Sequence, residues 1–450
     1  MAGRYKAYLE YKQPDIKFVN DIPTHWVISK VRHISTFGRG LPITKANLQD
    51  TGIPCVSYGE VHSKFGFEVD PSKHALKCVS EEYLASSPYA LLSKGDFVFA
   101  DTSEDIDGSG NFTQLVSDET LFAGYHTVIV RPSPANYYRF VAYLFDSPEF
   151  RTQVRDAVKG VKVFSVTQAI LKNASVWLPS FEEQQKIANF LDHETAKIDT
   201  LIAKQEKLIE LHKEKRQAVI SHAVTKGLNP DAPMKDSGVE WLGEVPEHWE
   251  VTRAKFVNKI FVPQRNKPEL NSNNIGTPWA TMDDMKSDFI LSTHHTVSDE
   301  ALKSAGSKVL PKGSVIASCV GNFGVASINK IDVVINQQLQ AYIPKRISSL
   351  YLRELVSISK CYFELVGTAA TLVYVNQQGF ENLPITLPSI EEQQDITDYL
   401  TAQKGKFDKL IVKCFNQVEL MKERKTALIS AAVTGKIDVR DWQPSPTKVS

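Results

Sequence analysis

Two segments of the chain, residues 178–227 and 387–436, carry apolar side chains at steps of three and four residues. Charged residues occupy the positions between them. One apolar stripe on an otherwise charged segment predicts a long amphipathic helix that needs a packing partner. We expect the two helices to pack on each other as a coiled coil. The predicted seam comprises Ile187, Leu191, Ile198, Leu201, Leu208 and Val219, with Ile396, Leu400, Phe407, Leu410, Met421 and Leu428 in the second segment; Ile202, Ile209 and Ile220 widen the first stripe.

The ends of these segments are typical of helix boundaries. Ser180 is a capping residue, and Glu182 and Glu183 follow it in the expected first turn. Thr-Lys-Gly and Thr-Gly-Lys close the segments near Gly227 and Gly435. Polar residues at stripe positions suit a role in setting the helix register; they are Glu194, Gln205 and His212.

Residues 27–177 and 250–386 have a different pattern, in which short β-branched and aromatic runs alternate with Gly, Pro, Asp and Asn. Strands are predicted at 95–100, 126–132, 314–320 and 333–344. Helices are predicted at 136–158 and 348–366. The predicted fold class is α+β, with two mixed α/β domains in tandem and a long helix after each.

The chain is a tandem duplication. The two helical segments align without a gap at an offset of 209 residues (387 minus 178), and about half of their positions are identical. A second repeated word, IPTHW at 22–26 and VPEHW at 245–249, precedes each variable region. The predicted boundaries are 1–177 for the first domain, 178–228 for its helix, 229–249 for a linker, 250–386 for the second domain, 387–437 for its helix and 438–450 for a polar, frayed tail.

Composition excludes several classes of protein. Hydrophobic residues make up 42% of the chain, enough for a core, and no apolar run is long enough to span a membrane. The N-terminus has no apolar signal core, and five scattered cysteines form no C-x-x-C pair, which fits a cytoplasmic protein. Lys and Arg number 52, as do Asp and Glu. Binding to DNA by bulk charge is therefore not expected.

Motifs of catalysis are absent from the sequence. It contains no phosphate-binding loop, no amino-methyltransferase motif and no dinucleotide-binding glycine pattern. Glu423 and Lys425 imitate a nuclease motif, but they lie on the polar face of a predicted helix. The pair His294 and His295 lacks companions at metal-ligand spacing, and the acidic run 101–107 is more typical of a solvated loop than of a cation site. We expect no catalytic residue, no metal and no cofactor in this chain.

The repeated words resemble those of one protein family. L-P-S-x-E-E-Q-Q precedes each long helix, P-x-H-W precedes each variable domain, and DSGVEWLGEVPEHWE at 236–250 and the helix ends AVISHAVTKGL and ALISAAVTGKI are highly specific. From about Ile22 to Ile437, the chain resembles the specificity subunit of Type I restriction–modification systems, which defend cells against phage. The N-terminal flank matches its central counterpart only loosely.

The resemblance implies an architecture and a set of partners. Each variable region would be a target recognition domain for one half of a split double-stranded DNA sequence, and the helices would pack antiparallel as a spacer with pseudo-two-fold symmetry. Two modification subunits carrying S-adenosylmethionine would bind this chain and methylate adenine. Restriction subunits with a translocase and nuclease, which use ATP and Mg, would join them. No membrane is implied.

Candidate DNA contacts are polar or planar side chains in loops at matching places in the two domains. The first group is Arg39 and Lys45 against Gln264, Arg265, Asn266 and Lys267; the second is Ser57, Tyr58, His62 and Lys64 against Thr281 and Met282. The third is Asn111 and Phe112 against Asn322 and Phe323, and the fourth is Lys162, Phe164 and Ser165 against Tyr374 and Asn376. A competing interpretation makes each glycine-flanked Phe a turn anchor in the core and Ser57 the cap of a strand.

Two other functions remain open at this point. A coiled-coil assembly protein could use its two variable domains to bind proteins, and a fused enzyme could carry an unrecognised active site. A salt-dependent mobility shift of duplex DNA in the presence of the modification subunit distinguishes DNA recognition from the assembly protein. Methyl transfer by the isolated chain would support the fused enzyme.

Overall fold

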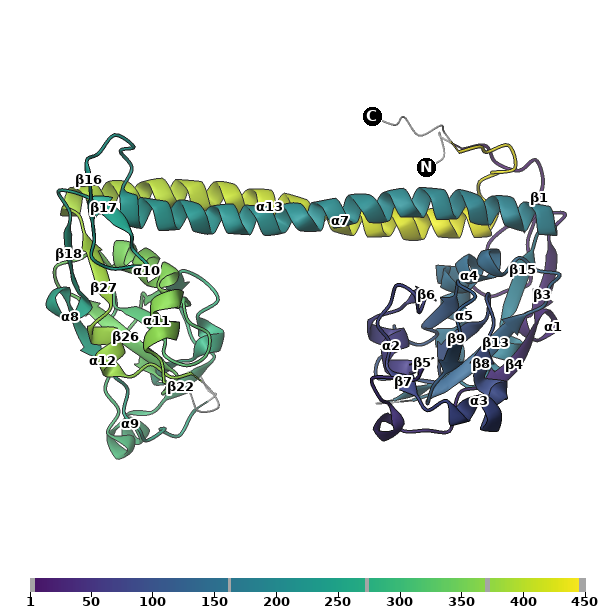
Figure 1. Ribbon diagram of the computed structural model, residues 1–450, viewed down its shortest axis with the longest axis horizontal. Helices are drawn as coiled ribbons and strands as arrows, with labels where there is room; N and C mark the ends of the chain where they lie inside the picture. The colour runs from purple at the N-terminus through teal and green to yellow at the C-terminus, as the bar shows by residue number, and fades with distance from the viewer. Residues whose placement is uncertain (1–4, 161–162, 272–274, 369–372, 445–450) are drawn as a thin grey trace. The chain divides into compact units, whose positions relative to one another are not determined.

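The computed structural model describes residues 5–160, 163–271, 275–368 and 373–444. The chain divides into two compact units (Figure 1). Unit 1 comprises residues 1–205 and 416–450, and unit 2 comprises residues 206–415. We call residues 27–177 domain 1 and residues 250–386 domain 2. No helix in the described part of the chain is long and apolar enough to cross a membrane.

Domain 1 is built on a five-stranded sheet with the strand order β4-β13-β9-β11-β6. All neighbours are antiparallel except β11 and β6. Every residue of β9 and β11 is buried, because both faces of the sheet centre are covered. The strands are β4 (Ser35–Arg39), β6 (Phe67–Val69), β9 (Phe97–Ala100), β11 (Phe112–Leu115) and β13 (Thr127–Pro132).

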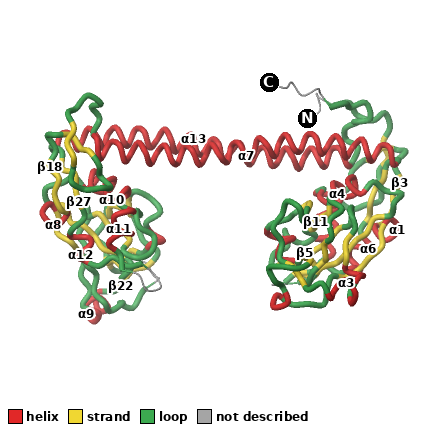
Figure 2. Tube along the Cα trace, in the orientation of Figure 1, coloured by secondary structure: helices red, strands yellow, loops and turns green. Residues whose placement is uncertain are grey.

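Shorter strands complete domain 1, and loops join them (Figure 2). A second sheet has the order β7-β5-β12-β8, formed by β5 (Ile53–Val56), β7 (Cys78–Val79), β8 (Leu91–Leu92) and β12 (Leu121–Ala123). Two-stranded pairs join β3 (Val27–Lys30) to β15 (Ser175–Leu178) and β10 (Thr102–Ser103) to β14 (Phe164–Ser165). Before domain 1, β1 (Tyr11–Lys12) pairs with β2 (Ile22–Pro23).

The predicted helix at 136–158 is two helices, α4 (Tyr138–Asp146) and α5 (Pro148–Ala157). Ser147 takes an extended conformation before Pro148 and caps α5 by accepting a hydrogen bond from Phe150 N. A residue before proline disfavours the helical conformation, which breaks the helix there. The other helices of domain 1 are α1 (Val31–Ile34), α2 (Tyr58–Ser63), α3 (Glu82–Ser86) and α6 (Gln168–Asn173), with 3₁₀ turns at Lys45–Asn47 and Pro88–Ala90.

Domain 2 repeats this strand order. Its five-stranded sheet is β19-β26-β23-β24-β21, again with a parallel pair at one end, and β20 lies between β22 and the parallel strand β25. The strands are β19 (Asn258–Phe261), β20 (Thr277–Ala280), β21 (Phe289–Ile290), β22 (His295–Val297), β23 (Val315–Ser318), β24 (Ala326–Asn329), β25 (Val334–Ile335) and β26 (Leu339–Pro344). β18 (Glu250–Arg253) pairs with β27 (Pro384–Leu387), and β16 (Met234–Asp236) pairs with β17 (Glu244–Pro246).

Two predictions in domain 2 need correction. The expected strand at 333–344 is two strands in different sheets, β25 and β26, separated by residues 336–338. The expected helix at 348–366 is interrupted at Ser359, whose hydroxyl donates to Leu355 O. The helices of domain 2 are α8 (Ala254–Val257), α9 (Asp299–Ala305), α10 (Ser349–Ile358), α11 (Lys360–Val366) and α12 (Gln377–Glu381), with a 3₁₀ turn at Met282–Asp284.

The two long helices are α7 (Phe181–Lys226) and α13 (Ile390–Val433). In unit 1, Lys425 of α13 pairs with Asp199 of α7 at 2.7 Å. In unit 2, Arg216 of α7 pairs with Asp408 of α13 at 3.5 Å. A second contact in each unit gives the direction: Lys186 near the start of α7 donates to Arg440 O just beyond α13 in unit 1, and Thr386 just before α13 donates to Val224 O near the end of α7 in unit 2. Within each unit, residue numbers rise along one helix as they fall along the other, so the two helices pack antiparallel. The expected boundaries are close, since Ser180 Oγ accepts from Glu183 N, and Gly227 and Gly435 have positive φ.

Most residues of the predicted seam are buried or partly buried, whereas Leu201, Leu208 and Leu410 are exposed. Neighbouring residues take their place: Ile209 and Ile220 of α7 and Cys414 and Val418 of α13 are buried, and Ile202 is partly buried. Both Leu201–Leu208 and Ile202–Ile209 follow helical spacing. Periodicity alone cannot choose between two adjacent apolar stripes, because the facing helix makes that choice.

The repeated sequence motifs P-x-H-W and E-E-Q-Q connect each domain to the start of its long helix. The Glu183 carboxylate accepts hydrogen bonds from Tyr8 Oη at 2.6 Å and Trp26 Nε1 at 3.1 Å, and it lies 3.0 Å from His25 Nε2. In unit 2, Trp249 Nε1 donates to Glu392 at 2.9 Å.

The adjacent glutamines act in the same way in the two units. Gln184 Oε1 accepts from Tyr137 N, and Gln393 Oε1 accepts from Ser348 N, both at 2.8 Å. The P-x-H-W and E-E-Q-Q words therefore have a structural role in holding each domain on its helix.

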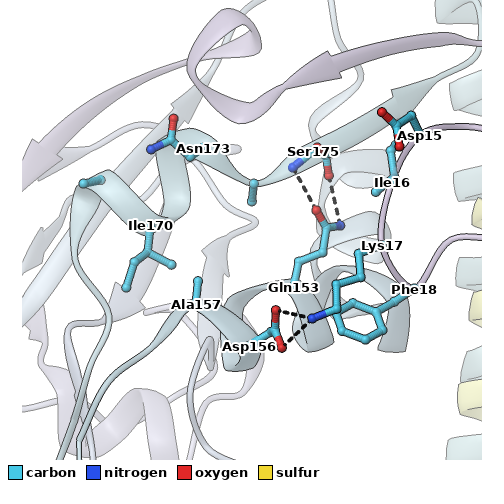
Figure 3. A pocket seen from close by; sticks show the side chains of 12 residues that line it. Asp15, Ile16, Lys17, Phe18, Gln153, Asp156, Ala157, Ile170, Asn173 and Ser175 are labelled. Atoms are coloured by element: carbon cyan, nitrogen blue, oxygen red, sulfur yellow. Dashed lines mark hydrogen bonds and ion pairs between the residues drawn. The ribbon is translucent and has the colours of Figure 1, made fainter.

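The N-terminal segment packs along domain 1. Lys17 Nζ pairs with Asp156 of α5 beside a hollow of about 410 Å³, where Gln153 also bonds to the backbone of Ser175 (Figure 3). The tail is less frayed than expected up to residue 444, because Trp442 packs against Phe190 of α7 at 5.4 Å between ring centroids.

Candidate nucleic-acid interface

The carboxyl ends of two parallel strands lie at one edge of each domain. In domain 1, β12 pairs with β5 (Ala123 with Val56); in domain 2, β25 pairs with β20 (Ile335 with Ala280). Parallel strands end on the same side of a sheet, so the residues that follow them become neighbours. Five segments of each domain meet at this edge, and four of the five contain residues of the groups that the sequence predicts.

Hydrogen bonds join five segments at this edge of domain 1. Gly124 N donates to Val56 O at 2.7 Å, and Leu41 N donates to Ala123 O at 2.9 Å. Asp101 N donates to His126 O at 3.1 Å, and Val166 N donates to Asp101 O at 2.8 Å. We call this region the strand-end surface of domain 1; it comprises residues 39–45, 57–64, 101–111, 124–126 and 163–166.

Domain 2 has the equivalent bonds. Cys319 N donates to Gln338 O and Val375 N donates to Cys319 O, both at 2.9 Å, just as Asp101 and Val166 bond in domain 1. Gln337 Nε2 donates to Gln264 O at 3.1 Å. The strand-end surface of domain 2 comprises residues 262–267, 281–282, 319–322, 336–338 and 373–376. The backbone arrangement is shared, whereas the side chains that it carries differ.

An aromatic cluster covers part of the strand-end surface of domain 1. The Tyr58 ring lies 5.6 Å from Tyr125 and 5.5 Å from His126, edge to face in both cases. A hollow of about 750 Å³ next to Tyr58 and His62 is bordered by the acidic run. In that run Asp105 Oδ1 accepts from Gly108 N and Asp107 pairs with Arg155, which matches the expected loop.

Asn111 is held by two neighbours. Its Oδ1 accepts from Arg151 Nη1 at 2.7 Å, and its Nδ2 lies 3.0 Å from His62 Nδ1. Since Nδ2 can only donate, His62 Nδ1 accepts and Nε2 carries the hydrogen that reaches Thr102 O at 2.8 Å. Both side chains serve the loop geometry in this arrangement.

The hollow beside the strand-end surface of domain 2 is larger and carries more positive charge. It measures about 860 Å³ and is lined by Lys267, Lys286, Asp283 and the amides of residues 336–338, whereas acidic side chains line the hollow of domain 1. Asp284 bonds to Thr281 and His294, which line this hollow. Burial alone would raise the pKa of the Asp284 carboxyl. Hydrogen bonds from His294 and Thr281 outweigh that effect and hold the pKa below its usual value.

The buried cysteines Cys55 and Cys319 have unreactive thiols. Burial raises the pKa of Cys55 and that of Cys319 to about 12, so both thiols stay protonated near neutral pH. Within the described part of the chain, no three His, Cys, Asp or Glu side chains gather as a metal site would require.

The sequence matches the type I restriction modification DNA specificity domain over residues 23–211 and again over 246–419. The chain belongs to this family. A proposed type I restriction enzyme specificity subunit of Methanocaldococcus jannaschii, MjaX, is 23% identical over 446 residues, 96% of this chain and 98% of the relative. The Escherichia coli K12 EcoKI specificity subunit is 23% identical over 57% of this chain and 53% of its own length.

Solved structures agree on the fold. A chain from work on the complex assembly and conformational transition of a type I restriction–modification system matches with a TM-score of 0.70 and 17% identity, over 92% of this chain and 99% of its own. The HsdS subunit from Thermoanaerobacter tengcongensis matches with a TM-score of 0.50 and 17% identity, over 92% and 98%. The predicted α+β fold with tandem recognition domains is thus confirmed.

Specificity subunits are the DNA-recognition components of these enzymes and perform no catalytic step. The prediction of a non-catalytic chain is therefore confirmed by the family and its relatives. Which side chains of this specificity subunit contact DNA stays a prediction, although the structure sorts the candidates by their accessibility.

Most candidates lie on the strand-end surfaces and are accessible. The exposed ones are Arg39, Lys45, Lys64, Ser165, Arg265, Asn266, Lys267, Asn322, Tyr374 and Asn376, and the half-buried ones are Tyr58, His62, Asn111, Phe164, Gln264, Thr281 and Met282. Lys162 lies outside the described residues. Asn376 also caps α12 by accepting from Gly379 N at 3.0 Å.

Three candidates lie in the interior instead. Phe112 is fully buried against Phe99 at 5.3 Å between ring centroids, and Phe323 packs against Phe363 at 6.0 Å. Ser57 is buried at the start of α2, where its backbone N donates to Glu60 Oε2 at 3.1 Å. The competing interpretation of the two Phe residues as core anchors fits the structure, whereas Ser57 lies at the start of a helix and does not cap a strand.

Two loops of the strand-end surfaces contain no residue of the four groups predicted from the sequence. Residues 124–126 lie between β12 and β13, and residues 336–338 lie between β25 and β26. A signal existed in the second, where Asn336, Gln337 and Gln338 form three consecutive polar residues inside an apolar run. Such a break favours a loop over a continuous strand.

Proposed function

We propose that this specificity subunit binds a bipartite, asymmetric DNA target and that each domain contacts one half of it. The support is the combination of one shared backbone arrangement with different side chains at equivalent positions. His126 in domain 1 corresponds to Gln338 in domain 2 because each accepts the matching backbone bond. Side chains of different hydrogen-bonding type select different bases, so the two halves would differ in sequence.

The subunit also scaffolds two modification subunits. Three exposed apolar positions repeat at the offset of the duplication, and each unit carries one complete set. Unit 1 has Phe181, Leu201 and Leu420, and unit 2 has Ile390, Leu410 and Leu211. Exposed apolar side chains at equivalent places favour two equivalent docking surfaces.

Partner subunits supply what this chain lacks. With 52 basic and 52 acidic residues it has no net charge to hold the DNA phosphates. The modification subunits would provide much of that charge together with S-adenosylmethionine. Restriction subunits would bring ATP and Mg to the complete complex.

Exchange of domain 1 tests this proposal. Residues 27–177 are replaced by the same region of a relative with a different target, and the methylated motif is mapped in cells that also express the modification subunit. One half of the motif should change and the other should stay, because base contacts are local to each domain. Exchange of residues 250–386 is the matched control and should change the other half.

If both halves change together, the modular proposal is wrong. If neither exchange alters the motif and duplex DNA is not bound, the two domains would instead bind proteins, as in a coiled-coil assembly protein.

A further inference from the structure

Resting on the proposed function, we propose that the loops 124–126 and 336–338 read the target sequence, with His126 and Gln338 as the specificity-determining side chains. They occupy equivalent places in the two domains, next to the four predicted groups. The ligand is the edge of a base pair in the major groove of duplex DNA, one half-site for each loop.

The backbone of the first loop is held in an unusual conformation. His126 has a φ of 56°, in the left-handed region that few side chains adopt. Neighbours fix it there: Asp101 N donates to His126 O at 3.1 Å, and Thr127 Oγ1 donates to Gly124 O at 2.7 Å. A conformation that costs free energy and is fixed from several sides is typical of a functional site.

The His126 ring has one nitrogen available for a ligand. Nδ1 lies 3.2 Å from Asp101 Oδ1, and in the neutral imidazole this places the hydrogen on Nδ1 and leaves Nε2 as an acceptor. The side chain is mostly exposed, and Tyr58 packs against its ring at 5.5 Å. An acceptor held in this way suits the amino group of cytosine or adenine.

Gln338 presents an amide at the equivalent position. Its Oε1 accepts from Asn336 Nδ2 at 3.3 Å and its backbone N donates to Asn336 Oδ1 at 3.1 Å, so the side chain is oriented but still exposed. A glutamine amide can pair with both N6 and N7 of adenine. Lys267 and Lys286 line the same hollow and are placed to contact phosphates beside the base.

Two asparagines of these surfaces serve the protein's own structure. Asn111 is held by Arg151 and His62, and Asn376 caps α12. In His126 and in Gln338 a neighbouring side chain orients the group, while Nε2 of each, and one lone pair of Gln338 Oε1, stay available for a base. That combination provides geometry for base readout at a low entropic cost.

The test uses the complete complex with its modification subunits. Methylation rates are measured on duplexes in which each base pair of the mapped target is replaced in turn. Gln338→Ala should lower discrimination at one base pair of one half-site by roughly 5- to 150-fold and leave the other half-site unchanged. His126→Asn, which keeps a residue that tolerates the left-handed conformation, should relax one base pair of the other half-site.

Gln338→Glu keeps the shape of the side chain and replaces the donor by an acceptor. It should shift preference toward a base with an exposed amino group, such as cytosine, and it decides the matter if Gln338→Ala impairs folding. Asn382→Ala is the control, since its amide contacts Arg253 and Gln378 and none of the five segments.

Unchanged discrimination in these variants, or an equal loss of rate on every duplex, would overturn the assignment of the loops. The proposed function would still stand in that case if exchange of residues 250–386 changes one half of the motif. A motif that no domain exchange alters would contradict the proposed function itself.

Discussion

Gly40 and Gly124 lie where three backbone segments come closest on the strand-end surface of domain 1. A Cβ atom on Gly40 would lie 1.9 Å from Gly124 O and 2.2 Å from Thr127 Oγ1. A Cβ atom on Gly124 would lie 2.2 Å from Ser57 Oγ. The absence of a side chain at these two positions allows the loop 124–126 to rest against the segments that support it.

Gly40→Ala should therefore destabilise domain 1 by about 1–3 kcal/mol, the usual cost of overpacking. Thermal melting of the full chain measures the change. Gly59→Ala is the matched control, because its added Cβ would meet nothing within 4 Å. Equal melting temperatures for the two variants would show that the segments are not held as closely as these distances require.

At the scale of elements, buried ion pairs hold a recognition domain to its helix. In unit 2, Lys404 of α13 contacts Asp288 and lies 3.1 Å from Glu354 of α10. Arg353 joins the same group, with Nη2 2.6 Å from Asp288 Oδ1. In unit 1 the corresponding connection runs from Arg139 of α4 to Asp192 of α7 at 2.7 Å. Burial makes the loss of one partner costly.

Lys404→Ala leaves Asp288 and Glu354 without their cation and should reduce the stability of unit 2 by about 3–5 kcal/mol. Hydrogen exchange of α10 and α13 in the full chain reports the effect on this unit. Lys409→Ala, an exposed lysine on the same helix, should change exchange little. If the backbone amides of α10 and α13 exchange at the same rate in the two variants, the ion pairs do not hold domain 2 on α13.

At the scale of the whole molecule, duplication gives each unit the same set of exposed apolar positions. The sets combine both helices, since Leu420 of α13 belongs to unit 1 and Leu211 of α7 belongs to unit 2. Antiparallel pairing places these equivalent residues in different units. Each proposed docking surface would thus be built from residues that are far apart in the sequence.

The mass of the co-expressed complex should correspond to two modification subunits per chain. Leu420→Glu or Leu211→Glu should each leave one modification subunit bound, because a charge on one apolar surface opposes docking there and leaves the other intact. Leu291→Glu, at an exposed leucine outside the sets, should not change the mass. A fully active complex with a single modification subunit would contradict two equivalent surfaces.

The candidate site could be predicted in outline only. Glycine-rich and polar words located four of the five segments on each strand-end surface, because loops between strands carry such residues. They could not separate Phe112, which is buried, from exposed neighbours such as Lys64. The sequence predicts one strand through residues 336–338, because apolar residues flank them on both sides. In the folded chain those flanks are β25 and β26, which belong to different sheets.

The sequence by itself determined the duplication, the two long helices with their ends, the α+β class of the domains and the family. These features follow from local patterns: periodicity, caps and repeated words are all visible in a single segment of chain. Tertiary structure alone decided that Ile209 rather than Leu208 is buried and that the Glu183 carboxylate contacts Tyr8, His25 and Trp26. It also decided that the loops 124–126 and 336–338 lie among the candidate residues. Each of those outcomes depends on which surface another segment presents, and that information is not local to any stretch of the sequence.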